Sequence, residues 1–265
     1  MKSELHFAHA NGLPSATYQL LLSQLEAHYQ IKTIPMLGHD PAYPVTNNWT
    51  HLKRQLIHTI EREHQQPVIG VGHSLGGALT LMAALDRPEL FKAVVLLDVP
   101  TFNRAESWLV RMAKSTGLID HITPARKSKN RRTQWPSREV AIEYFAQRKM
   151  FANFHPQCLA DYVTHSLVAN EQGSFDLGYR LEVELAVYRT LPHKMVLSKR
   201  QMKVPMGVLV GRDTDTVRQH QYRRMKHKLG FTSRVVAGSH MFPLEYPVET
   251  ARDIRQLLIK MGVRD

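Results

Sequence analysis

Ser74 has the sequence setting that most clearly indicates chemistry. It stands within residues 70–77, Gly-Val-Gly-His-Ser-Leu-Gly-Gly, directly after an apolar run typical of a buried strand. A serine at a sharp turn between a strand and a helix needs tiny neighbours two positions away on both sides, because larger side chains would collide there. The pattern therefore predicts a nucleophile elbow, with the Ser74 hydroxyl above a helix N-terminus that favours negative charge.

A serine hydroxyl is a weak nucleophile at neutral pH, so Ser74 needs a base within hydrogen-bond reach and a third group that orients this base. Histidine suits the base role because its pKa lies near working pH. Among 15 histidines, His240 is favoured because it lies in a loop after the last predicted strand, between Gly238 and Pro243. The alternative for His240 is an ordinary surface histidine.

Short apolar runs alternate with helical patterns along most of the chain. Strands are predicted at residues 5–8, 31–35, 67–71, 93–98, 206–211 and 233–237. Helices are predicted between them, at about 18–25, 52–60, 77–84, 216–229 and 248–261. Either Asn48 or Thr50 is expected to cap the second helix. This alternation predicts an α/β fold with a doubly wound, mostly parallel sheet.

The alternation stops between residues 100 and 203. Helical segments at 138–150 and 156–169, punctuated by prolines, replace the strand and helix units there. We therefore interpret residues 101–203 as an inserted helical cap and residues 1–100 and 204–265 as the core. Since no flexible linker is evident, the cap is expected to be an insertion and not a separately tethered domain.

Composition places further bounds on the chain. Its 265 residues are 43% hydrophobic, enough to bury one large core. No apolar run approaches the roughly 20 residues of a membrane span, and the N-terminus lacks the apolar core of a secretory signal. The single cysteine, Cys158, fits a reducing compartment, so we expect a cytoplasmic protein with a structural thiol. No cofactor is implied, and no compact histidine and carboxylate cluster indicates a metal.

The formal net charge is +12, and basic residues are densest at 126–132 and 218–228. Tyr222 is the only aromatic residue in either segment, which argues against nucleic acid because base stacking uses interleaved aromatic residues. The simplest interpretation is a generally basic surface. Attraction of an anionic substrate or an anionic membrane surface is a further hypothesis. The sequence leaves the oligomeric state open.

Four segments in order make the chain resemble the α/β-hydrolase superfamily over essentially its whole length. They are the loop at 9–14, the elbow at 72–76, the acidic turn after 208–211, and the segment at 238–243. The elbow and the final histidine are specific, whereas the other two are looser. The chain begins at what would be the third strand of the eight-stranded family sheet, so the resemblance implies about six strands.

The resemblance implies a catalytic triad in the order Ser, acid, His. The family commonly places the acid three residues after the glycine of the acidic turn, where this sequence has Thr214. We favour Asp215, because Asp-Thr-Val resembles the Asp-Pro-Val often seen at that turn, with Asp213 as the close alternative. Asp98, after the strand at 93–98, is the third candidate, since some members take their acid from there. A capping role at the entrance to the cap is favoured for Asp98.

The resemblance also implies an oxyanion hole made of two backbone amides. They are those of Leu75, directly after the nucleophile, and Leu13 in the loop after the first strand. This loop departs from the family's His-Gly pair by two inserted residues, so the amide or side chain of Asn11 is an alternative to Leu13. His9 is expected to brace this loop, and His73 to pack or hydrogen-bond within the elbow.

These residues imply a metal-independent serine hydrolase that cleaves carboxylic esters of small or medium acyl chains through an acyl-enzyme. Ser74 would be the nucleophile and His240 the general base. The cap would set the substrate, although most of its aromatic residues are expected to form its core. The same triad supports a thioesterase, a lactonase or an acyltransferase. An alternative of another class is a non-catalytic basic binding module, against which the intact serine, histidine and acids argue.

Overall fold

A parallel sheet forms the centre of the computed structural model, which describes residues 2–194, 202–224, 226–227 and 230–263. Its six strands lie in the order β2-β1-β3-β4-β8-β9, and every neighbouring pair is parallel. The strands are β1 (Ser3–Ala8), β2 (Tyr29–Thr33), β3 (Val68–His73), β4 (Phe91–Leu97), β8 (Met206–Gly211) and β9 (Thr232–Val236). The predicted doubly wound sheet of about six strands is confirmed.

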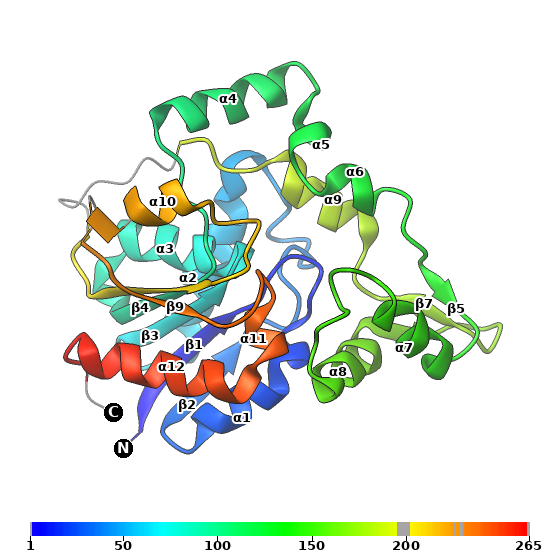
Figure 1. Ribbon diagram of the computed structural model, residues 1–265, viewed down its shortest axis with the longest axis horizontal. Coiled ribbons are helices and arrows are strands. Elements are labelled where there is room, and N and C mark those ends of the chain that lie inside the picture. The colour runs from blue at the N-terminus through cyan, green and yellow to red at the C-terminus, as the bar shows by residue number, and fades with distance from the viewer. Residues whose placement is uncertain (1, 195–201, 225, 228–229, 264–265) are drawn as a thin grey trace.

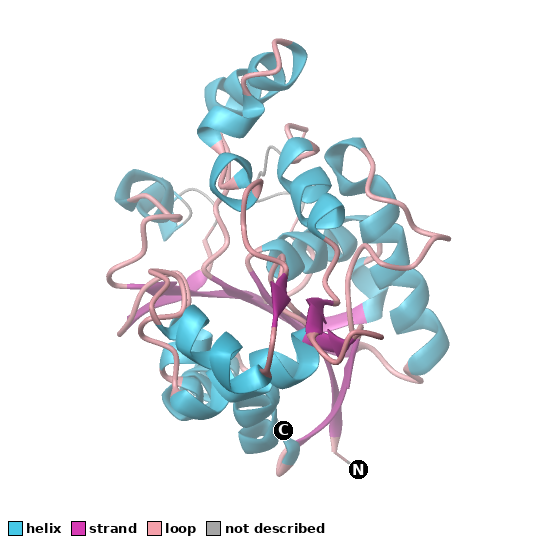
Figure 2. Cartoon of the chain, turned by 90° about the vertical axis from the view of Figure 1, so that its right-hand side faces the viewer, coloured by secondary structure: helices cyan, strands magenta, loops and turns pink. Residues whose placement is uncertain are grey.

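Helices cover both faces of this sheet (Figures 1 and 2). One face carries α1 (Gln19–Glu26) and α12 (Pro247–Lys260), and the other carries α2 (Thr50–Glu63) and α3 (Leu75–Asp86). All residues of β3 and β8 are buried, as strands covered on both faces require. Side chains of one strand alternate between the two resulting cores.

The start of α2 differs from the prediction. A short 3-10 turn, η2 (Asn47–Trp49), precedes the helix, and neither Asn48 nor Thr50 caps it. Instead Asn48 has a φ of 60°, and its side-chain oxygen accepts a hydrogen bond of 2.9 Å from the amide of His193. Asn48 therefore ties the end of the cap to the core, a long-range contact that a local capping pattern does not reveal.

Between β4 and β8, the described residues of the predicted cap, 101–194 and 202–203, contribute no strand to the large sheet. The helices of the cap are α4 (Arg104–Ser115), α5 (Ile119–Ile122), α6 (Ala125–Ser128), α7 (Arg138–Ala146), α8 (Pro156–Ser166) and α9 (Leu181–Arg189). A small antiparallel sheet in the order β5-β7-β6 joins them, made of β5 (Gln134–Trp135), β6 (Leu167–Ala169) and β7 (Phe175–Leu177). The expectation of a helical cap missed these strands, because two or three residues are too few to show a period. The helix predicted at 156–169 ends at Ser166, and residues 167–169 form β6.

The remaining elements are short. They are η1 (Ser15–Tyr18), η3 (Pro88–Leu90), α10 (Gln219–Arg224) and α11 (Phe242–Glu245). The helix predicted at 216–229 is observed as α10, and residues 225 and 228–229 lie outside the described residues.

Aromatic side chains fill the centre of the cap. Phe145 packs edge-on against Tyr162 with ring centroids 5.0 Å apart, and Phe151 lies 4.7 Å from the same ring. Trp135 is fully buried beside Phe145. This cluster is continuous with the core beneath α1 and α12, so apolar packing joins the cap to the core.

The helices and the single cysteine bear on two expectations from composition, a membrane span and a structural thiol. No helix in the described ranges combines the length and the apolar character needed to cross a membrane. The thiol of Cys158 is buried in α8, and burial raises its pKa to about 12. A neutral, buried thiol of this kind packs as a small apolar group, in agreement with the structural role predicted for it.

Three buried polar side chains connect β1 with the end of α2. His64 Nδ1 lies 2.8 Å from the carboxylate of Glu4, and His6 Nδ1 lies 3.2 Å from His64 Nε2. Desolvation, with a smaller contribution from His64, lowers the pKa of His6 to about 3. Folding therefore holds His6 neutral at a pH where a solvated histidine would be protonated.

We expect the free energy of unfolding to decrease as the pH falls from 6.5 toward about 3, because unfolded His6 then binds a proton that folded His6 does not. The contribution of His6 is fully present above pH 6.5, and it falls by about 1.4 kcal/mol per pH unit in the middle of this range. Urea unfolding at neutral pH and near pH 5 measures it. His6→Leu is the reference because it lacks the imidazole of His6, so wild type should lose more stability than the variant. Equal losses in both proteins would contradict the prediction.

Candidate active site

Ser74 occupies the sharp turn between β3 and α3. Its φ of 51° and ψ of −113° are unusual for a residue with a side chain, as the predicted elbow requires. A Cβ on Gly76 would lie 2.1 Å from the carbonyl oxygen of Ala8, and one on Gly72 would lie 2.5 Å from the carbonyl carbon of Gly76. Both glycines are thus fixed by close backbone approach, and the local geometry of the predicted elbow is confirmed.

A continuous hydrogen-bond chain runs from Ser74 through His240 to Asp98. The Ser74 hydroxyl lies 3.1 Å from His240 Nε2, and His240 Nδ1 lies 2.7 Å from Asp98 Oδ2. The three residues follow β3, β9 and β4 in the sheet, so parallel pairing brings them to the same carboxyl edge.

The carboxylate of Asp98 is fully buried and fully hydrogen-bonded. Oδ1 accepts from the amide of Gly211 at 3.0 Å, and Oδ2 accepts from the hydroxyl of Thr214 at 2.6 Å as well as from His240. A buried carboxylate with these donors is an acceptor only, so it holds the proton of His240 on Nδ1. Nε2 is left free to accept the proton of Ser74.

The prediction that Asp215 orients His240 is wrong in this structure, because His240 pairs with Asp98. The side chain of Asp215 is 81% exposed and lies 3.9 Å from the ammonium of Lys149. The alternative Asp213 is also exposed, and its backbone amide donates to the carbonyl of Gly238. Thr214 lies between these two residues in the turn and points inward. The hydroxyl of Thr214 donates to the carboxylate of Asp98, which directly follows β4.

The capping role favoured for Asp98 is also wrong. Asn103 caps α4, because its side chain accepts from the amide of Glu106 at 2.8 Å. The Glu106 carboxylate accepts in return from the Asn103 amide at 2.7 Å, which completes a capping box. Asp98, the third acid candidate from sequence, instead accepts the hydrogen bond from His240 Nδ1.

His73 positions the backbone of His240. Its Nε2 donates to the carbonyl of His240 at 2.9 Å, and its Nδ1 accepts from the hydroxyl of Tyr18 at 2.7 Å. Desolvation lowers the pKa of His73 well below its ordinary value, so the ring is neutral and can fill both roles. The partners of His73 lie outside the elbow, in contrast to the prediction. Tyr18 gave no sign of this contact, because it lies on the apolar stripe of a helical segment.

The loop after β1 is braced by His9, as predicted. His9 Nδ1 donates to the carbonyl of Ala10 at 2.7 Å, and its Nε2 accepts from the amide of Leu37 at 2.8 Å. Burial lowers the pKa of His9 to about 4, which keeps this arrangement neutral at physiological pH.

The backbone amides of this loop decide which donors can face an oxyanion. The Leu13 amide donates to the carbonyl of Ala10 at 3.3 Å, so Leu13 is not available and its predicted role is wrong in this conformation. The Ala10 amide donates to Tyr18, and the Gly12 amide contacts the hydroxyl of Tyr179.

The side chain of Asn11, the other alternative from sequence, is also occupied. Its Nδ2 donates to the carbonyl of Glu184 at 3.1 Å, and its Oδ1 accepts from Tyr179 at 3.2 Å. Leu75 is the first residue of α3, so its amide has no acceptor within the helix. Of the amides considered from sequence, those of Leu75 and Asn11 remain candidates for oxyanion donors.

A buried ion pair of the cap packs against the loop after β1 at Gly12. Arg131 and Glu184 are 2.5 Å apart with only 17% and 5% of their side chains exposed, and Ser128 donates to the carboxylate at 2.8 Å. A carboxylate oxygen of Glu184 lies 3.3 Å from the place of a Cβ on Gly12. The basic run at 126–132 predicts a generally basic surface, whereas Arg131 is largely buried against Glu184. A basic run does not show which of its residues will find a buried acid.

The hydrogen-bond chain predicts the reactivity of Ser74. Asp98→Asn should slow the modification of Ser74 by a fluorophosphonate by a thousandfold or more, roughly, because an amide no longer holds the imidazole in the required tautomer. Asp215→Asn, the matched control in the exposed turn, should react like wild type. The assignment of Asp98 is contradicted if Asp215→Asn is the slow variant.

The buried pair predicts an asymmetric effect on stability. Glu184→Gln leaves the Arg131 guanidinium without its counter-charge and should lower the free energy of unfolding by about 3 kcal/mol. Glu182→Gln on the same helix is the control, because Glu182 is 74% exposed and 3.9 Å from Arg180. Urea unfolding compares the two variants, and equal losses would show that burial of the pair is unimportant.

Comparison with known proteins adds an independent line of evidence. The family model described as "Alpha/beta hydrolase family" matches residues 7–253. An "Abhydrolase domain-containing protein AFT2-1" of Alternaria alternata is 33% identical over 108 residues, which cover 41% of this chain and 36% of that protein. A "Type I acyl-CoA thioesterase mpaH'" of Penicillium brevicompactum is 27% identical over 173 residues, 59% of this chain and 38% of that protein. The matches thus span little more than a third of the length of these curated relatives.

Solved structures extend the similarity in fold to nearly the whole chain. The structure of an E-2-(acetamidomethylene)succinate hydrolase has a TM-score of 0.77 and 18% identity, and the match covers 97% of this chain and 91% of that one. The sheet, the elbow geometry and the family match agree, and the chain belongs to the alpha/beta hydrolase family.

Proposed function

We propose that this protein is a serine hydrolase that cleaves carboxylic esters of small or medium acyl chains through an acyl-enzyme. The observation that carries the proposal is the hydrogen-bond chain of Ser74, His240 and Asp98 at the carboxyl edge of the sheet. Its order and tautomer are those that activate a serine hydroxyl.

The first half-reaction transfers the acyl group to the enzyme. His240 Nε2 takes the proton of Ser74 as the serine oxygen attacks the ester carbonyl carbon, and Asp98 stabilises the resulting imidazolium. When the tetrahedral intermediate collapses, the bond to the alcohol oxygen breaks and His240 donates its proton to that oxygen. The alcohol leaves, and the acyl group stays on Ser74.

Water completes the reaction in the second half. His240 takes a proton from water as the water oxygen attacks the acyl carbon, and returns this proton to Ser74 when the acid leaves. The carbonyl oxygen carries negative charge in both tetrahedral intermediates. We assign its stabilisation to the amides of Leu75 and Asn11, each contributing about 3 kcal/mol to transition-state stabilisation.

Thioester cleavage is the second candidate, favoured by the relative whose name is Type I acyl-CoA thioesterase. The same steps apply, with a thiolate in place of the alkoxide as leaving group. Transfer of the acyl group to an alcohol acceptor would use the same first half-reaction and replace water in the second.

Labelling with a fluorophosphonate tests the proposal directly. Wild type should be labelled and should hydrolyse a chain-length series of p-nitrophenyl esters, and Ser74→Ala should lose both properties because the nucleophile is gone. Ser23→Ala, a serine of α1 outside the site, is the control and should behave as wild type.

Two further arms separate the alternatives. Faster turnover of acyl-CoA thioesters than of the matching oxygen esters would favour the second candidate, and diversion of the acyl group to an added alcohol would favour transfer. A folded wild-type protein that is neither labelled nor active on any of these substrates would contradict the proposal and favour a non-catalytic binding module.

A further inference from the structure

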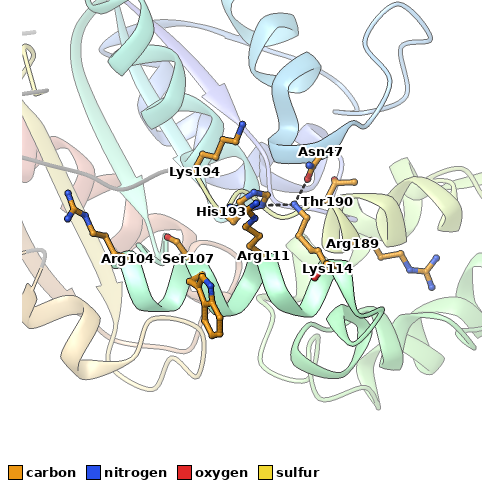
Figure 3. Close-up of a pocket in the computed structure, with 11 residues that line it drawn as sticks. Asn47, Arg104, Ser107, Arg111, Lys114, Arg189, Thr190, His193 and Lys194 are labelled. Atoms are coloured by element: carbon orange, nitrogen blue, oxygen red, sulfur yellow. Dashed lines mark hydrogen bonds between the residues drawn. The ribbon is translucent and has the colours of Figure 1, made fainter.

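A cavity of about 940 Å³ lies beside α4, η2 and the segment after α9 (Figure 3). The lining residues that matter to its chemistry are Trp108, Arg111, Lys114, Arg189, His193 and Lys194. None of these residues takes part in the hydrogen-bond chain of Ser74. The volume is in the range of sites that hold a nucleotide-sized molecule.

The cavity gathers positive charge without a matching acid. None of its described lining residues is a carboxylate, and Arg189 has its own partner outside, with bonds of 2.9 and 2.6 Å to Asp120. In Figure 3, Lys114 and His193 meet near the centre and Arg111 reaches toward them, whereas Arg189 points away at one end.

Lys114 is the central cation. Its half-buried ammonium donates to the side-chain oxygen of Asn47 and to the carbonyl of Leu191, and lies 3.0 Å from His193 Nδ1. Burial lowers the pKa of Lys114 to about 8. All of these partners are neutral oxygens or an imidazole, so the charge is held in place without being neutralised.

The surrounding charges act on one point. Desolvation lowers the pKa of His193, and the charges of Lys114, Arg111 and Lys194 lower it further. Three cations that destabilise one protonated imidazole create a positive potential in the cavity. An anion bound there would relieve both the repulsion among these cations and the desolvation of Lys114.

The backbone of the cavity is fixed before any ligand binds. The amide of Asn48 donates to the carbonyl of Thr190 at 2.9 Å, and the amide of His193 donates to the side chain of Asn48 at 2.9 Å. Trp108, on the same helix α4 as Arg111 and Lys114, is 58% exposed and offers an aromatic face.

We propose that this cavity binds a phosphate-bearing organic molecule, with the phosphate groups bound by Arg111 in the positive field of Lys114 and Lys194 and the organic part against Trp108. Phosphate suits the site because it carries more than one negative charge, and arginine binds it through two parallel hydrogen bonds. A nucleotide and a lipid headgroup share this chemistry, and the test distinguishes them.

Calorimetric titration with ADP, pyrophosphate and citrate tests the proposal. Wild type should bind ADP and pyrophosphate, more weakly as salt is added, and citrate should bind clearly more weakly. Arg111→Gln and Lys114→Gln should each weaken phosphate binding about tenfold, because the first removes a charged hydrogen bond and the second removes a positive charge beside the phosphate. Arg111 has an exposed side chain, so its variant keeps the test valid if Lys114→Gln does not fold.

Lys260→Gln is the matched control, because it removes the same charge from α12 on the opposite side of the molecule from α4 (Figure 1). It should bind like wild type, whereas Trp108→Ala should weaken the binding of ADP and leave that of pyrophosphate unchanged. Phosphatidylcholine vesicles with and without phosphatidic acid form the lipid arm. Charge-dependent vesicle binding lost in Arg111→Gln, without binding of ADP, would assign the phosphate to a lipid headgroup.

The proposal is overturned if wild type binds no phosphate ligand, if citrate binds as tightly, or if Lys260→Gln loses as much affinity as the cavity variants. These measurements need no turnover and can be made in Ser74→Ala. Their failure would leave the proposed hydrolase activity standing, and an inactive enzyme that binds ADP here would leave this site standing.

Discussion

The buried carboxylate of Asp98 is the group on which the geometry of the site depends. A charge in a dry interior is costly unless donors surround it, and the donors here come from the end of β8, the turn that follows, and the loop after β9. The hydrogen bonds of this one side chain therefore hold together the loops after β4, β8 and β9 at the carboxyl edge of the sheet. The ring of His240 is placed as a consequence of this requirement and is not left to the flexibility of its own loop.

A second set of contacts holds the same histidine from behind. His73 binds the carbonyl of His240, Tyr18 binds His73, and the Ala10 amide binds Tyr18. The elbow, the base and the loop after β1 are thus connected through two neutral side chains. Preorganisation of this kind reduces the rearrangement needed when a substrate arrives, because the reacting groups already stand at hydrogen-bond distance.

The elbow and His240 could be predicted from sequence because their signals are local: glycines at fixed offsets, and a histidine between a glycine and a proline after the last strand. The acid could not, since three carboxylates stood at suitable chain positions and only the packed turn shows that Thr214 points inward while Asp213 and Asp215 face solvent. The parallel, doubly wound character of the sheet followed from the alternation of strands and helices. Arg131 was missed because its partner Glu184 is distant in sequence.

The contact between the cap and the loop after β1 has a consequence for how such a protein can diverge. Asn11 and Gly12 are seated on Glu184, and Tyr179 of the cap holds both Asn11 and the carbonyl of Leu37. The insertion is therefore not an exchangeable module. A cap grafted from another member of the family would have to bring its own carbonyl and hydroxyl to these positions, so new selectivity is reached more easily by substitutions within the existing cap than by replacement of the whole insertion.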